Sequence, residues 1–109
     1  MTTFTDKQIN AWKWHSTSEV DGILADTAVN ITPENYKRKV DTFRVLRAAG
    51  FDEQVENHLP TFFRNIAHLG FENPLLAAQV RAVTLNLVFE VSQTPNSTYA
   101  RLAEISAPH

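Results

Sequence analysis

Apolar residues recur at helical spacing along most of this chain. In several segments hydrophobic side chains return every third or fourth position, a pattern typical of helices that bury one face. The pattern predicts helices over approximately residues 6–29, 33–49, 52–69, 74–92 and 96–105. The core expected from these stripes consists of Val20, Ile23, Leu24, Val40, Phe43, Leu46, Val55, Leu59, Phe62, Ile66, Val80, Val83 and Leu87.

Helix starts are marked by capping residues. Thr5 with Gln8 three positions later forms a capping box, in which each side chain bonds the other residue's backbone N–H. Thr32 stands before a proline and predicts an N-cap for the helix over 33–49. Ser16 with Glu19 is a second capping box inside the first segment. We therefore expect the helix over 6–29 to bend or break near Ser16.

Two stretches of ten residues, 43–52 and 63–72, resemble one another, and near its end each has a glycine followed by a phenylalanine and an acidic residue. A glycine after a helix supplies the left-handed conformation that ends it, so both Gly50 and Gly70 predict helix ends of this kind. Repeat arrays require at least three copies. We interpret the similarity as two helices that end in the same way, each aromatic ring packing back on the last turn.

The segment 74–92 is apolar around nearly its whole circumference, with Gln79, Asn86 and Glu90 forming a narrow polar stripe. A helix of this kind is either central in its domain or shared with another chain. In a domain this small, four helices can hardly cover the whole surface of a fifth. We therefore expect a homodimer through the helix over 74–92, since exposed apolar faces mark interfaces.

These elements predict an all-α protein with a single domain over residues 1–109. We expect a compact bundle of four main helices plus a short C-terminal helix, with the helix over 74–92 central or at a dimer interface. Hydrophobic residues make up 43% of the 109 positions, enough for one continuous core. The apolar segment contains two charges and is short for a membrane span. With no signal-peptide pattern at the start, a cytoplasmic protein without a membrane anchor is expected.

Catalytic and metal-binding motifs are not found in the sequence. There are no cysteines, which excludes disulfides, thiolate metal sites and cysteine nucleophiles. The four histidines do not follow a metal-ligand spacing, and there is no glycine-rich phosphate loop. We therefore predict no catalytic residue, no metal and no cofactor. A small helical enzyme or ligand-binding bundle stays an alternative without positive support.

The residues 33–50 carry five basic and two acidic side chains, whereas 52–73 carry four acidic and one basic. This division favours complementary surfaces on adjacent helices. A nucleic-acid-associated protein using the basic helix over 33–49 is an alternative, but the net charge of −2 argues against it. The side chains of this helix that could contact a partner are Lys37, Arg44 and Arg47.

Two further residues are candidates for partner contact. Trp14 points away from the stripe of its helix, which suggests a contact with a partner unless a bend at Ser16 packs the ring. Arg81, like Arg47, falls on an apolar face, and each is a candidate for an ion pair across an interface unless it reaches solvent at an edge. The absence of catalytic motifs and the apolar segment 74–92 together favour a protein–protein interaction module: a small helical adaptor, regulator or assembly protein.

Overall fold

In a computed structural model of the chain, which describes residues 4–93, the protein is all-helical over that range. The predicted fifth helix over 96–105 lies outside the described residues. The elements are α1 (Asp6–Lys13), α2 (Thr17–Thr27), α3 (Tyr36–Ala48), α4 (Asp52–Ala67), the short 3₁₀ turn η1 (His68–Gly70) and α5 (Pro74–Ser92).

The first predicted helix is divided into α1 and α2. Ser16 is the N-cap of α2, its hydroxyl accepting from the Glu19 N–H, while a Glu19 carboxylate oxygen accepts from the Ser16 N–H. This backbone hydrogen bond from Ser16, followed by the one from its side chain, holds the pKa of Glu19 below its ordinary value of 4.5. Thr5 and Gln8 form the expected box at α1. The break near Ser16 is therefore confirmed.

The helix predicted over 33–49 begins later, at Tyr36. Residues 33–35 form a turn in which the Thr32 hydroxyl accepts from the Asn35 N–H and the Asn35 side chain accepts from the Thr32 N–H. Thr32 thus makes the hydrogen bond of an N-cap, but on the turn that leads into α3. Among the described residues the last helix is α5, which has the predicted bounds, and the Asn73 side chain accepts from two N–H groups of its first turn.

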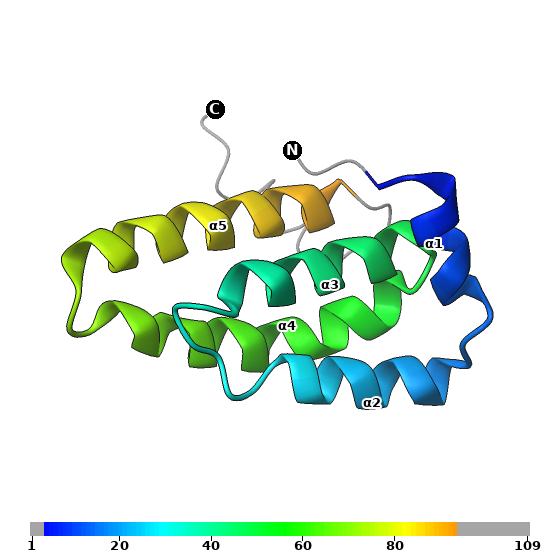
Figure 1. Ribbon diagram of the computed structural model, residues 1–109, viewed down its shortest axis with the longest axis horizontal. Helices are drawn as coiled ribbons and strands as arrows, with labels where there is room; N and C mark the ends of the chain where they lie inside the picture. The colour runs from blue at the N-terminus through cyan, green and yellow to red at the C-terminus, as the bar shows by residue number, and fades with distance from the viewer. Residues whose placement is uncertain (1–3, 94–109) are drawn as a thin grey trace.

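α3 and α4 form the centre of the arrangement (Figure 1). α2 packs along one side of this pair and α5 along the other, while α1 packs on α3. The helix over 74–92 was expected to be central or at a dimer interface, and the described residues do not place it at the centre. α5 lies at an edge and contacts α3, α4 and η1, which leaves part of its circumference uncovered.

The core lies between these helices. Eleven of the thirteen expected core residues are buried, and the other two, Ile23 and Val83, are half-buried against them. The Phe43 ring of α3 meets the Phe62 ring of α4 at a centroid distance of 4.6 Å. Val45 is also buried, although it lies off the predicted stripe. Its side chain lines the contact with α1, which includes Trp12.

Polar side chains of α3 and α4 hold the C-terminal end of α2. The Lys39 ammonium group donates to the backbone oxygens of Asp26 and Val29, and the Asn65 amide donates to that of Ala28. These carbonyls would otherwise have no intrahelical partner. Burial, followed by the charge of Arg38, lowers the pKa of Lys39. The end of α2 is thereby fixed to the two inner helices.

Candidate interaction surface

Four of the five exposed large apolar side chains of the described residues lie on α5 and the turn before it. Leu85 and Phe89 are 61% and 64% exposed, and Leu75, in the first turn of α5, is 71% exposed. Phe71, in the turn, is 76% exposed. Large apolar side chains that gather on one surface mark contact sites, whereas single ones do not.

The exposed face of α5 is a regular stripe. Its members are Leu75, Ala78, Ala82, Leu85 and Phe89, all exposed and separated by three, four, three and four residues. This alternation places the five side chains in one line along the helix, the arrangement of the a and d positions in a coiled coil. We call these five residues the α5 stripe. The opposite face of the helix supplies Val80, Leu87 and Val91 to the core.

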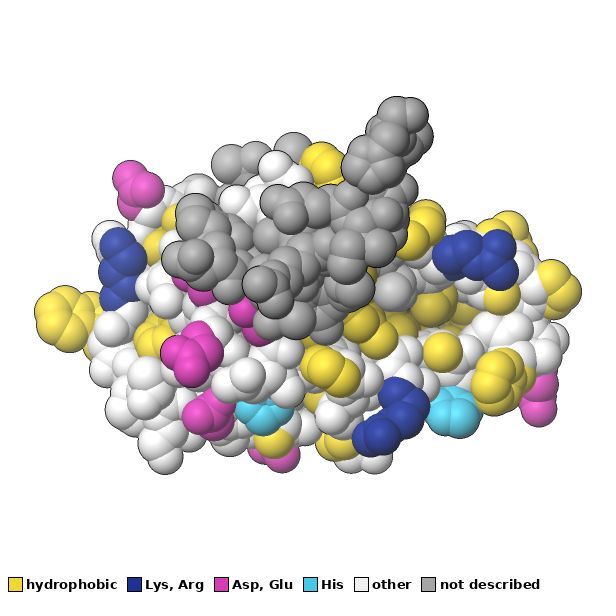
Figure 2. Space-filling model, turned by 180° about the vertical axis from the view of Figure 1, so that it is seen from behind, with side chains coloured by type: hydrophobic (Ala, Val, Ile, Leu, Met, Phe, Trp, Pro, Cys, Tyr) yellow, Lys and Arg dark blue, Asp and Glu magenta, His cyan; other side chains and the backbone are white. Residues whose placement is uncertain are grey.

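Beside the α5 stripe lies a groove between α5 and the end of α4, with a volume of about 420 Å³. Its lining is mainly apolar and includes Phe63, Ile66, Phe71, Ala77, Arg81 and Leu85. Figure 2 shows hydrophobic side chains gathered in a hollow at the end of the molecule where α4 turns into α5, with Lys or Arg side chains on two sides of it. We call this hollow the α4–α5 groove.

Gly70 allows the groove to close at its end. A Cβ atom on this residue would lie 2.7 Å from the Cβ of Ala77 and 2.9 Å from its Cα. The glycine is thus required by the close approach of η1 to α5. The expected left-handed backbone is found at Gly50, with a φ of 101°, but not at Gly70. The two glycines at similar places in the sequence therefore have different roles.

The two phenylalanines after these glycines also differ. Phe51 packs against the core, as expected, because Gly50 turns the chain back over α3. The Phe71 side chain is instead exposed to solvent, and its ring lies edge-on to the His68 ring at a centroid distance of 5.1 Å. The expectation that both rings pack on the preceding helix is wrong for Phe71. This residue was not among the predicted contact residues.

The predicted contact residues are not brought together at one place. Trp14 ends α1 and is 90% exposed, so the bend at Ser16 does not pack its ring. Arg81 is exposed at the edge of the α4–α5 groove and makes no ion pair with another residue in the range 4–93. Because its charge is solvated, Arg81 does not require the counter-ion that a buried charge would need.

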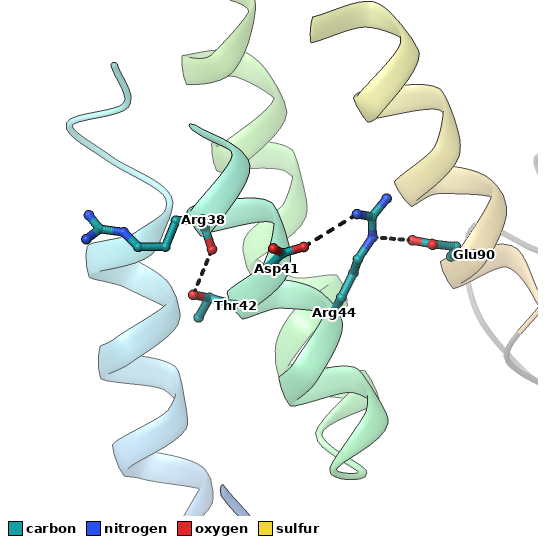
Figure 3. Close-up of polar contacts among 5 residues, drawn as sticks. All are labelled: Arg38, Asp41, Thr42, Arg44 and Glu90. Atoms are coloured by element: carbon teal, nitrogen blue, oxygen red, sulfur yellow. Dashed lines mark hydrogen bonds and ion pairs between the residues drawn. The ribbon is translucent and has the colours of Figure 1, made fainter. Parts of the chain in front are cut away.

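Arg44 is used within the fold (Figure 3). Its Nε donates to the Glu90 carboxylate of α5 at 2.9 Å, and its Nη1 lies 3.6 Å from the Asp41 carboxylate on α3. All three groups are at least partly shielded from solvent. Arg44 therefore joins α3 to α5 within the chain. The sequence pattern predicts this residue as a contact to a partner, and does not predict its contact with α5.

The other basic residues of α3 are also mostly engaged. Arg47 lies 3.9 Å from the Asp52 carboxylate at the turn into α4, so its ion pair is within the chain. Lys37 is exposed, with its ammonium group 5.9 Å from the centroid of the Tyr36 ring. The predicted complementarity of α3 and α4 is thus seen at the Arg47–Asp52 pair, while Arg44 turns to α5 instead. α3 does not present a continuous basic face.

The histidines of the described chain do not form a metal site. His58 Nε2 lies 3.2 Å from the Asp21 carboxylate, and the His15 ring lies beside Trp12 at a centroid distance of 5.1 Å. Within residues 4–93, no three metal-ligating side chains come together. α5 is long enough to cross a membrane, and its best window has a mean hydropathy of 1.3. Core helices of soluble proteins meet the same criteria of length and hydropathy, and one face of α5 packs in the core of this protein.

Comparison of the chain with known protein families, with characterised proteins and with solved structures finds no match. The features of the described chain that bear on its function are therefore the surface of α5 and the groove beside it.

Proposed function

We propose that this protein is a protein–protein interaction module that acts as a homodimer, in which the exposed face of α5 is the contact between the two copies. The observation that carries the proposal is the α5 stripe, whose five exposed side chains are all apolar. The 3–4 spacing of the stripe is that of helices that pair with other helices. An adaptor, regulator or assembly role fits a chain whose exposed apolar surface is a helix face.

The size of the surface agrees with this proposal. A fully buried aromatic side chain contributes roughly 150–250 Å², and Phe71 and Phe89 each leave more than half of their surface exposed. A standard interface buries about 800 Å² on each partner. The four large exposed residues of α5 and its preceding turn supply a substantial part of that area, and the small residues between them let a second helix approach.

A second copy is favoured over a nucleic acid as the partner. The only basic or acidic side chain beside the α5 stripe at the groove is Arg81, among the residues the structure describes. Nucleic-acid binding depends on many phosphate contacts. The basic helix that could have supplied them, α3, has Arg44 and Arg47 in ion pairs within the chain.

Light scattering on the native protein and on Leu85→Asp tests the proposal. The native chain is expected to be a dimer at micromolar concentration, and Leu85→Asp a monomer with unchanged helical content, because the carboxylate would be buried in the contact without a partner. Ala25→Asp is the matched control. Ala25 is exposed on α2, so the same charge there should leave the dimer intact.

Two results would overturn the proposal. One is a native chain that stays monomeric at the highest attainable concentration. The other is a monomer that sediments with vesicles of mixed zwitterionic and anionic lipid and loses this binding in Leu85→Asp, which would assign the exposed face of α5 to a membrane surface.

A further inference from the structure

The side chains of the α5 stripe differ in size in a systematic way. After Leu75 in the first turn, the stripe continues with two small residues, Ala78 and Ala82, and then with two large ones, Leu85 and Phe89. All four are exposed. Helices that pair through such a line of residues must fill the space between them at the density of a protein interior. The order of small and large residues therefore determines which relative orientation of two copies packs well.

A parallel pair of α5 helices in register does not satisfy this requirement. Each residue would face its own equivalent, so that Phe89 would meet the partner's Phe89 and Ala78 the partner's Ala78. The layers at Leu85 and Phe89 would be overfilled, and those at Ala78 and Ala82 would contain voids. Both faults are destabilising in a packed interface.

We infer that two copies pair through the α5 stripe in antiparallel orientation, with the two-fold axis passing between Ala82 and Leu85. The inference rests on the homodimer proposed above and specifies its geometry. Ala82 then packs against the partner's Leu85, and Ala78 against the partner's Phe89. Each of the four layers from Ala78 to Phe89 combines a small residue with a large one, and the two-fold symmetry makes each combination occur twice. Leu75 lies beyond the paired part of the stripe.

The residues that flank the stripe are compatible with this orientation. On one edge Gln79 comes beside the partner's Asn86, and their exposed amide groups can hydrogen-bond with one another. On the other edge Arg81 comes beside the partner's Val88. The two Arg81 side chains lie on the same edge, but both are exposed and solvent screens their repulsion. The fit of the apolar layers therefore decides the orientation.

An exchange of small and large residues tests the inference. Ala78→Phe should place two phenylalanines in each outer layer, and Phe89→Ala should leave two alanines there. Each change alone is expected to raise the dimer dissociation constant by about tenfold or more, which corresponds to about 1.4 kcal/mol. In the double variant each outer layer again holds one phenylalanine and one alanine, so the dissociation constant should return to within about threefold of the native value. Sedimentation equilibrium measures all four proteins, and circular dichroism checks that each stays folded.

Disulfide trapping gives a second, independent readout, because the native chain has no cysteine. Ala78→Cys mixed with Phe89→Cys carrying an affinity tag should give a mixed disulfide under mild oxidation, since these positions face one another only in the antiparallel pair. Neither variant alone should cross-link. Disulfides within each variant would indicate a parallel pair and overturn the inference.

The outcomes separate this inference from the proposed function. A native dimer that is not rescued in the double variant, and that does not form the mixed disulfide, would contradict the antiparallel pairing while leaving self-association in place. A native monomer would contradict both.

Discussion

Gly50 and Gly70 are needed for different physical reasons. Gly50 adopts a φ of 101°, a conformation that residues with a Cβ atom rarely reach. Gly70 has an ordinary backbone, but Ala77 of α5 packs directly against it. A Cβ atom on Gly70 would lie only 2.7 Å from the Cβ of Ala77. The sequence predicted a helix end at both positions. It could not predict the contact at Gly70, because that contact depends on how α5 folds back on α4.

Substitution of Gly70 by alanine is therefore expected to destabilise the fold. The new Cβ would overlap Ala77, and overpacking of this kind costs about 1–3 kcal/mol. Gly22→Ala is the control, since a Cβ atom there would have no heavy atom within 4 Å. It lies inside α2 and should stabilise the protein by about 0.5–1 kcal/mol through helix propensity. Urea unfolding followed by circular dichroism compares the two variants. Equal effects would show that η1 does not pack closely on α5.

At the scale of the helices, the residue at which a helix begins is easier to predict from the sequence than the face that it buries. Capping boxes at Thr5 and Ser16 are local in sequence, so they could be recognised without a fold. The stripes of α2, α3 and α4 likewise gave the core, because each of these helices has one apolar side. α5 has apolar residues on both sides. Which side enters the core depends on where α3 and α4 lie, and the sequence pattern of α5 does not contain that information.

Phe62 is expected to contribute strongly to the packing of α4 on α3. The ring is almost fully buried against Phe43. Phe62→Ala should lower the free energy of unfolding by about 3–5 kcal/mol. Phe71→Ala removes the same side chain from an exposed position and should change stability by no more than about 0.5 kcal/mol. Chemical denaturation measures both. A small effect of Phe62→Ala would mean that the core is assigned incorrectly.

At the scale of the molecule, the candidate contact residues are spread over several elements. The sequence indicated Trp14, Arg81 and the basic residues of α3 as candidates, but Arg44 and Arg47 make ion pairs within the chain. The pair of Arg44 and Glu90 joins helices distant in sequence, whereas Arg47 and Asp52 lie at the ends of two consecutive helices. The sequence therefore predicts that α5 has more apolar surface than one face needs, and the positions of α3 and α4 decide which part of it stays exposed.

Thermal unfolding should depend on protein concentration if the dimer forms. Association stabilises the folded state by mass action, so the midpoint temperature is expected to rise as the concentration increases. For Leu85→Asp the midpoint should be independent of concentration, because this variant is expected to be monomeric. Calorimetry over a hundredfold range of concentration measures both proteins. A native midpoint that does not change would argue against dimerisation in this range.

The order of small and large residues along the α5 stripe also bears on how many copies can assemble. In an antiparallel pair, each copy uses the stripe from Ala78 to Phe89, and the contact maps onto itself under the two-fold rotation. This part of the stripe is then not available to a third chain. Head-to-tail contacts, by contrast, leave a free end on each added subunit and can extend into filaments. If two copies pair as proposed, the exposed apolar face of α5 would not lead to open-ended polymerisation, because the two-fold contact ends growth at two copies.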